Sequence, residues 1–266
     1  MYTVYLNLPC QTPFLLSTNC IDIFQYLKQK YGAYALDHRE DERNYIPISV
    51  VKDQKDYIIE TKGEAYSTSN PMFEIVQWIN KCRQYDDSVF ALHGAAVEWK
   101  GKADVFLAPT TSGKSTLTAY LTSQGCGYLS DDCVLLDRSD FNIHPHTTPI
   151  QLREGGYNLL KQLGGLLPTE CFVDNYSRSP RYIFMPPTCI TISMPLNRIF
   201  FIQRNEERNG IVPLSCIERI NRLTKAPIIE YPINVSYLKI ISKLAQWECS
   251  VLLYKDMDYI KKIVQG

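Results

Sequence analysis

The stretch Ala108-Pro109-Thr110-Thr111-Ser112-Gly113-Lys114-Ser115 has the pattern of a phosphate-binding loop, with alanine in place of the first glycine. The apolar run Val105-Phe106-Leu107 before it predicts a buried strand. Leu117 and Leu121 follow at helical spacing, which predicts a helix over residues 115–123 that Gly125 closes. A strand, this loop and a helix in that order are typical of a site for a nucleoside triphosphate.

Backbone N–H groups of such a loop and the N-terminus of its helix face a phosphate together. In this pattern Lys114 reaches the outer phosphates, and Ser115 offers its hydroxyl to Mg²⁺. Gly113 stands where the backbone comes closest to phosphate, whereas the glycine that Ala108 replaces mainly permits a tight turn. A chance Gly-Lys-Ser in a loop is the alternative, but the flanking strand and helix favour ATP with Mg²⁺. We expect seven residues to bind this cofactor: Thr110, Thr111, Ser112, Gly113, Lys114, Ser115 and Thr116.

Composition excludes several function classes. The chain has 266 residues, of which 45% are hydrophobic, enough for a sizeable core. Lysine plus arginine and aspartate plus glutamate number 28 each, so no global charge favours nucleic acid or an anionic membrane as partner. The N-terminus lacks a secretory pattern and no run of about 18 apolar residues occurs, which predicts a cytoplasmic protein. Nine dispersed cysteines without a C-x-x-C pair favour buried thiols over zinc or disulfides.

Residues 1–88 are expected to form a small N-terminal α/β segment. The apolar stripe from Ile23 to Tyr31, ended by Gly32, predicts a helix, and Asn70-Pro71 is expected to open a second one. Strands are expected at residues 46–51 and 57–60. The polar residues 84–88 are the best candidate boundary.

Residues 89–266 alternate strands with helices, which predicts an α/β fold. A hairpin that turns at Lys100-Gly101-Lys102 leads into the phosphate-binding loop. Residues 144–187 are expected to be irregular. Ser215 and Glu218 form a capping box that opens a helix, and Ser236 is expected to open another. Further strands are expected near residues 128–129, 133–136, 189–193 and 198–202.

Asp131 and Asp132 follow a short apolar run and lie seventeen and eighteen residues after Lys114. A strand that ends in a carboxylate beside a phosphate-binding loop is the usual way to hold a Mg²⁺ shell. We expect Ser115 and Asp132 to hold the metal, and Asp131 to accept the proton of an incoming hydroxyl, a role worth typically ~10²–10⁴ in rate. The two aspartates can exchange these roles, and a solvated Asp-Asp turn is the alternative.

His93-Gly94 begins twenty-one residues before Lys114, and a lone histidine is more often structural than catalytic. The ordered segments His93-Gly94-Ala95-Ala96, Thr110 to Thr116 and Leu129-Ser130-Asp131-Asp132 nevertheless resemble the signature of the HPr kinase/phosphorylase family, over about residues 89–205. The resemblance implies a phosphoenolpyruvate-carboxykinase-like P-loop kinase core at residues 89–266. It also implies that His93, Asp131 and Asp132 lie close to an attacking serine hydroxyl.

Departures from this pattern limit what the resemblance implies. Ala108 and Thr111 replace family glycines, and residues 151–156 only echo the family's glutamate-arginine-glycine segment, so phosphorylase activity is not implied. The chain is more similar to HPr-kinase-like enzymes found beside lasso peptide biosynthesis genes, which phosphorylate the C-terminal serine of the precursor peptide. The similarity lies in length, in the N-terminal segment and in residues 148–156, and implies a peptide or protein substrate with an acceptor serine.

Arg153 fits a clamp for a phosphate or a carboxylate, because a guanidinium makes bidentate contacts with both groups, and a surface arginine is the alternative. His144 and His146 lack a third ligand at suitable spacing, so they indicate a metal site only weakly. Arg178 and Arg181 lie in a polar run that either covers the site as a mobile lid or is a solvated loop. We favour the solvated loop.

The sequence thus predicts a Mg²⁺- and ATP-dependent serine kinase whose catalytic residues are His93, Asp131, Asp132 and Arg153. A kinase of a small hydroxylated metabolite would use the same core with a different acceptor pocket. A nucleotide-sensing module that binds ATP without transferring it belongs to another class. The sequence does not identify the acceptor. It also leaves open whether the chain is a monomer or a homo-oligomer.

Overall fold

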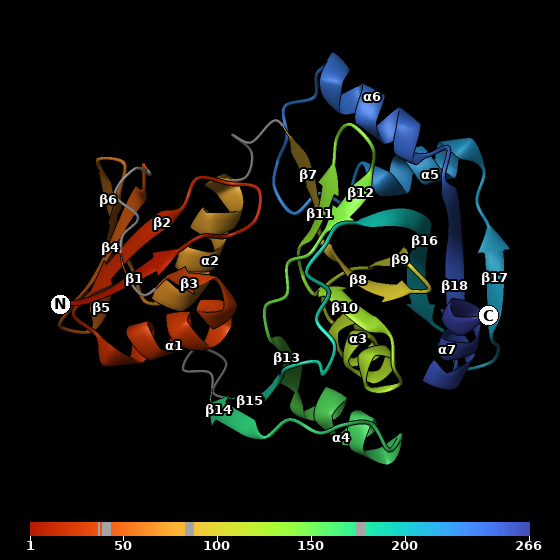
Figure 1. The fold of residues 1–266 in the computed structure, drawn as a ribbon, viewed down its shortest axis with the longest axis horizontal. Helices are drawn as coiled ribbons and strands as arrows, with labels where there is room; N and C mark the ends of the chain where they lie inside the picture. Colours follow the sequence, from red (N-terminus) through yellow and green to blue (C-terminus); the bar gives the residue numbers. More distant parts are fainter. Residues whose placement is uncertain (37, 39–43, 83–87, 174–178) are drawn as a thin grey trace. The chain divides into compact units, whose positions relative to one another are not determined.

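The computed structural model describes residues 1–36, 38, 44–82, 88–173 and 179–266. The chain divides into two compact units, Met1–Asp86 and Asp87–Gly266, each of which is described by itself (Figure 1). Of the boundary expected at residues 84–88, only Ser88 lies in the described part. No helix among the described residues is long and apolar enough to cross a membrane.

The N-terminal unit is a six-stranded sheet in the order β3-β1-β2-β4-β5-β6, with two helices packed on one face. Both expected helices and both expected strands are confirmed, and the side chain of Asn70 accepts a hydrogen bond from Phe73 N at 3.4 Å. The remaining strands were not predicted. The elements are β1 (Tyr2–Leu6), β2 (Phe14–Thr18), α1 (Ile21–Tyr31), η1 (Gly32–Tyr34), β3 (Ala35–Leu36), β4 (Ile46–Asp53), β5 (Asp56–Thr61), β6 (Glu64–Thr68) and α2 (Pro71–Cys82).

The C-terminal unit is built on an eleven-residue strand, β16 (Met194–Arg204). This strand is parallel to both β9 (Lys102–Leu107) and β18 (Glu248–Tyr254), while its start pairs with β12 (Asn142–His144). The sheet order is β10-β8-β9-β16-β12-β11-β7, and β17 (Gly210–Pro213) pairs with β18. The other strands are β7 (Val89–Leu92), β8 (Gly94–Trp99), β10 (Gly127–Ser130) and β11 (Val134–Asp137).

Helices cover both faces of this sheet. One layer contains α3 (Lys114–Ser123), α4 (Glu154–Gln162) and α7 (Met257–Gln265), with Leu117, Leu160 and Ile260 in its core. The other contains α5 (Cys216–Leu223) and α6 (Val235–Leu244), with Leu223 and Ile241 in its core (Figure 1). Residues 103–107 of β9 are all buried, as expected for a strand covered on both faces. Ligands of such sheets bind at the carboxyl ends of the parallel strands, where the phosphate-binding loop follows β9.

Several predictions for this unit are wrong. The stretch expected to be irregular holds α4 and a three-stranded sheet of β13 (Ile150–Arg153), β15 (Pro180–Phe184) and β14 (Glu170–Val173). The strand expected at residues 189–193 is reduced to one bridge between Tyr128 and Cys189. The side chain of Asn234, rather than Ser236, caps α6. All nine cysteines are free, but Cys171 and Cys216 are exposed instead of buried.

Candidate functional site

The start of β8 lies beside the carboxyl ends of two neighbouring strands. β8 is antiparallel to β9 on one side and to β10 on the other, with Gly94 opposite Leu107 and Ala96 opposite Ser130. The phosphate-binding loop, which leaves β9, and Asp131, which follows β10, therefore begin at the edge where His93 enters β8. β7 ends with Leu92 opposite Val134 of β11, which also brings His93 toward Asp132. The sheet register thus gathers three site segments that are far apart in the sequence.

Close backbone packing at position 94 explains why a glycine follows His93. A Cβ atom at Gly94 would lie 2.6 Å from Leu107 Cδ2 and 2.8 Å from the carbonyl oxygen of Phe106. Contacts that short force neighbouring atoms to move, so the close approach of β8 to the end of β9 requires glycine. The backbone N–H of His93 donates a hydrogen bond to Ala226 O at 2.7 Å, which fixes the chain at this point.

The loop before α3 has the backbone geometry of an anion site. Thr111 and Gly113 have positive φ angles of 70° and 91°, and Ser112 N donates a hydrogen bond to Pro109 O at 3.3 Å. Gly113 is the N-cap of α3, and no side chain caps this helix end. The first N–H groups of α3 therefore have no capping side chain, and such a helix N-terminus favours an anion.

Lys114 is a buried cation, 5% exposed, in the first turn of α3. Its Nζ donates hydrogen bonds to the carbonyl oxygens of Ala108 at 2.7 Å and Pro109 at 3.1 Å. Burial lowers the pKa of Lys114 from 10.5, and the negative charges of Asp132 and Asp131 oppose that shift. The loop's own carbonyls and the nearby carboxylates thus compensate the burial of this charge.

Tyr254, at the end of β18, holds the loop from the far end of the sequence. Its hydroxyl donates a hydrogen bond to Ser112 O at 3.1 Å, and a Cβ atom at Gly113 would lie 3.2 Å from the same hydroxyl oxygen. Ser112 Oγ is buried, and the structure shows no hydrogen-bond partner for it within the described ranges. An anion oxygen in the loop would satisfy this hydroxyl. No motif in the sequence pointed to Tyr254.

These features fit the triphosphate group of ATP: an uncapped helix N-terminus, a hydroxyl that lacks a partner and a buried lysine. The described ranges contain no group of three His, Cys, Asp or Glu side chains suited to a metal ion. Mg²⁺ in nucleotide sites typically keeps several waters and uses one or two carboxylates plus the substrate's phosphates. The half-buried Ser115 in the first turn of α3 and one aspartate suffice for that role.

The two aspartates differ in burial and backbone geometry. Asp131 is 5% exposed, whereas Asp132 is exposed and has a left-handed backbone with φ of 67°. The hydroxyl of Ser130 donates a hydrogen bond to Cys133 O and closes the turn around both. Asp and Asn adopt this left-handed conformation more readily than most residues, which suits aspartate to position 132.

His93 interacts electrostatically with both Lys114 and Asp132. Burial lowers the pKa of His93 below 6.5, and the positive charge of Lys114 lowers it further, while Asp132 opposes both effects. The imidazole is therefore predominantly neutral at pH 7. A neutral imidazole has one donor and one acceptor nitrogen, so it can orient a hydroxyl or a carboxylate.

Arg153 is exposed at the junction of β13 and α4. No interaction that the structure shows for the described residues joins it to the histidine or the aspartate pair. The first turn of α4 nevertheless contacts the phosphate-binding loop's helix, because a Cβ atom at Gly156 would lie 2.5 Å from Thr116 Oγ1. Arg153 also lies directly opposite Arg181 of β15. The expectation that Arg181 belongs to a loop is therefore wrong, and Arg178 lies outside the described residues.

His144 and His146 do not form a metal site in the described ranges. The imidazole of His144 contacts Asp137 Oδ2 at 3.2 Å and Ser193 Oγ at 2.9 Å. His146 is buried and forms a parallel bridge with Ser130.

Comparisons with known proteins find a distant structural similarity and no related sequence. No family model matches the sequence, and no curated protein matches it. Among solved structures the chain is similar to the Hpr(Ser) kinase/phosphatase from Coxiella burnetii, with 11% sequence identity over 65% of this chain and 93% of that chain and a TM-score of 0.32. A similarity at this level does not establish a common fold.

Proposed function

We propose that this chain is a Mg²⁺- and ATP-dependent serine kinase with an HPr-kinase-like P-loop core. The observation that carries the proposal is the sheet register that brings His93, the phosphate-binding loop with its buried Lys114, and the Asp131-Asp132 turn to one edge of the sheet. A cation for phosphates, a carboxylate for a metal or a proton, and a neutral imidazole are the groups that phosphoryl transfer to a hydroxyl uses.

Each residue has a distinct task in this proposal. The loop amides and Lys114 bind the phosphates, and Ser115 with Asp132 holds Mg²⁺. When bound, ATP supplies the phosphoryl group and Mg²⁺ neutralises its charge. Asp131 accepts the proton from the serine hydroxyl, and His93 orients that hydroxyl. Positioning and charge stabilisation account for most of such catalysis, so the hydrogen bond by which Tyr254 anchors the loop at Ser112 favours it.

We assign the acceptor as the C-terminal serine of a peptide, such as a lasso peptide precursor. Arg153 is exposed at the start of α4, the helix whose first turn contacts Thr116 of α3. A guanidinium makes bidentate contacts with a carboxylate, which supports a clamp for the peptide's terminal carboxylate. A bidentate contact of this kind contributes ~1.5–3 kcal/mol.

The experiment uses γ-labelled ATP, Mg²⁺ and three peptides that differ only at the last residue: serine with a free carboxylate, serine amide and alanine. We expect transfer to the free-acid serine, at least tenfold lower kcat/KM for the amide, and no transfer to alanine. Arg153→Ala should remove the preference for the free acid, and the exposed Arg208→Ala is the control variant.

Other outcomes select the alternatives. Equal use of acid and amide peptides by the wild type would remove the carboxylate clamp while keeping a serine kinase. Transfer to a member of a panel of hydroxylated metabolites, and to no peptide, would make the chain a metabolite kinase. Tight ATP binding without transfer to any acceptor would favour a nucleotide-sensing module.

A further inference from the structure

Arg204 is the last residue of β16, the strand that pairs with both β9 and β18. In the parallel pairing of β16 with β9, Phe201 lies opposite Leu107, the last residue of β9. β16 continues for three more residues, up to Arg204, while the chain after Leu107 has already entered the phosphate-binding loop. Arg204 therefore stands beside the loop, at the carboxyl edge of the parallel strands where ligands of such sheets bind.

The side chain of Arg204 belongs to the face of the sheet that α3 covers. Successive side chains of a strand point to opposite faces. Phe200 and Ile202 pack in the core of the α3 layer, and Arg204 follows them with the same period of two. On β18, Leu252 and Tyr254 pack in the same layer, and Tyr254 lies directly opposite Arg204. Arg204 is thus on the face from which the loop passes into α3.

Tyr254 connects Arg204 to the phosphate-binding loop. The hydroxyl of Tyr254 donates a hydrogen bond to Ser112 O at 3.1 Å. Burial raises the pKa of Tyr254, and the positive charge of Arg204 opposes that shift. The guanidinium therefore lies within electrostatic range of the phenol that holds the loop.

The guanidinium of Arg204 is available for a ligand. Arg204 is exposed, and no hydrogen bond or ion pair joins its side chain to another residue of the described ranges. Two other arginines of this unit have structural partners: Arg198 of the same strand binds the Asp104 carboxylate, and Arg219 donates to backbone carbonyl oxygens. A free guanidinium beside an anion-binding loop can make bidentate contacts with a phosphate group.

Arg204 and the predicted reacting groups lie on opposite sides of the loop. His93 and Asp131 come from the β8 and β10 side of β9, whereas Arg204 comes from the β16 side. In the proposed kinase, the transferred phosphoryl group faces the acceptor hydroxyl and its proton acceptor. The phosphates that are not transferred then lie toward β16, and ADP keeps both of them.

We propose that Arg204 binds the α- and β-phosphates of the nucleotide, from the side of the loop opposite His93. Arg204 supplies a second cation beside Lys114 and stabilises bound ATP and bound ADP alike. This inference rests on the proposed function for its ligand, because it requires a nucleotide in the phosphate-binding loop. It does not require transfer of the phosphoryl group.

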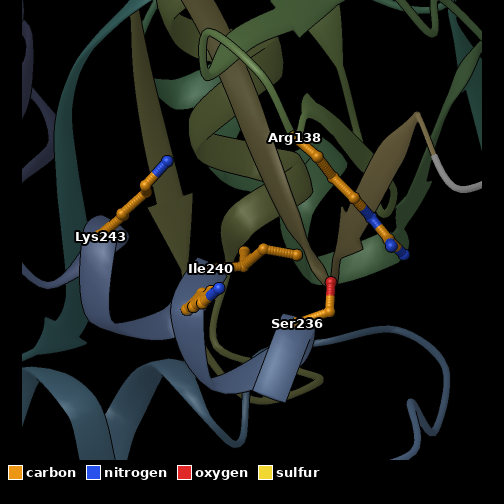
Figure 2. Close-up of a pocket in the computed structure, with 5 residues that line it drawn as sticks. Arg138, Ser236, Ile240 and Lys243 are labelled. Atoms are coloured by element: carbon orange, nitrogen blue, oxygen red, sulfur yellow. The ribbon is translucent and has the colours of Figure 1, made fainter. Parts of the chain in front are cut away.

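Isothermal titration with ATP and with ADP, both in the presence of Mg²⁺, tests this assignment. Arg204→Gln should raise both dissociation constants about tenfold and by the same factor, because both nucleotides keep the α- and β-phosphates. Arg204→Lys should recover part of the loss, since it restores the charge but not the bidentate geometry. The control variant is Lys243→Gln. This exposed lysine lines a pocket with Arg138 and Ile240 in the α6 layer (Figure 2), and its substitution should change both constants less than twofold.

Kinetics distinguish these phosphates from the transferred one. In Arg204→Gln the KM for ATP should rise about tenfold, while kcat at saturating ATP falls less than twofold. A large loss of kcat with unchanged ADP affinity would place Arg204 at the transferred phosphoryl group and overturn the assignment. Wild-type affinity for both nucleotides in Arg204→Gln would also overturn it, and would leave Arg204 as a solvated side chain.

Failure of the kinase proposal is a separate outcome. Weaker binding of both nucleotides by Arg204→Gln, without transfer by the wild type to any acceptor, would retain Arg204 as a nucleotide-binding residue and remove the kinase. Transfer by the wild type, with unchanged nucleotide affinity in Arg204→Gln, would do the reverse. If the wild type bound neither ATP nor ADP, both proposals would be wrong.

Discussion

Gly156, in the first turn of α4, lies directly against Thr116 of α3, where a Cβ atom at position 156 would come within 2.5 Å of Thr116 Oγ1. The adjacent Gly155 has no heavy atom within 4 Å of the corresponding position. Both glycines belong to the same helix turn. A comparison of alanine substitutions at the two positions therefore separates the effect of helix propensity from that of packing. The contact couples α4 to the helix that carries Lys114.

Gly156→Ala should lower the free energy of unfolding by ~1–3 kcal/mol, because the added methyl group must displace Thr116. Gly155→Ala should raise it by up to ~1 kcal/mol, since alanine is the better helix former at an exposed position. Urea unfolding followed by circular dichroism measures both. Equal shifts of the two variants would show that α4 does not pack tightly against α3.

Local signals explain which elements could be predicted. The hairpin turn at Lys100 and Gly101 has positive φ angles of 51° and 77°, as a short glycine-containing turn requires. By contrast, α4 begins with Glu154-Gly155-Gly156, and two glycines lower the local helix propensity. Burial of Leu160 in the core stabilises this helix, and such tertiary packing leaves no local pattern.

The candidate site was likewise predictable only in part. The loop residues follow a motif, and the resemblance named His93, Asp131 and Asp132. Tyr254 lies 142 residues from Ser112, and no pattern in the sequence pairs these two residues. Their contact depends on the parallel pairing of β16 with β9 and β18, which is a long-range property of the sheet.

Lys114→Ala should raise the dissociation constant of ATP by about 10- to 100-fold, because a buried cation that contacts phosphates contributes ~1.5–3 kcal/mol. Isothermal titration with ATP and Mg²⁺ measures the change, and transfer to peptide should fall to background. Lys102→Ala removes an exposed lysine from the start of β9 and serves as the control. Wild-type affinity and turnover in Lys114→Ala would exclude the phosphate-binding loop as the nucleotide site.

His93 should make the stability of the chain depend on pH. Its pKa is lowered by burial, so between pH 6.5 and the lower folded value the unfolded chain binds more protons than the folded one. The stabilisation is fully present above pH 6.5 and is lost as the pH falls through the folded pKa. The urea concentration at the unfolding midpoint should therefore decrease as the pH is lowered from 7.5 to 5.5. The decrease should be smaller in His93→Gln. His38→Gln, an exposed histidine, should behave as the wild type. An identical decline in all three proteins would contradict the shift.

The last prediction separates the roles of the two aspartates. Asparagine preserves size in both, and it tolerates the positive φ of 67° at position 132, where alanine would add backbone strain. Asp131→Asn should keep ATP affinity while lowering kcat by about 10²-fold or more, because it removes a proton acceptor. Asp132→Asn should instead raise the Mg²⁺ concentration needed for half-maximal transfer, because it removes a metal ligand.

Steady-state kinetics at several Mg²⁺ concentrations distinguish these cases. If Asp132→Asn lowers kcat without a change in Mg²⁺ dependence and Asp131→Asn changes that dependence, the two roles are exchanged. Burial alone does not decide between them, since a 5% exposed carboxylate can either face a buried hydroxyl or complete a metal shell. Wild-type kinetics in both variants would leave the pair as a structural turn that Ser130 closes. The proton acceptor would then be His93, whose neutral imidazole has an acceptor nitrogen.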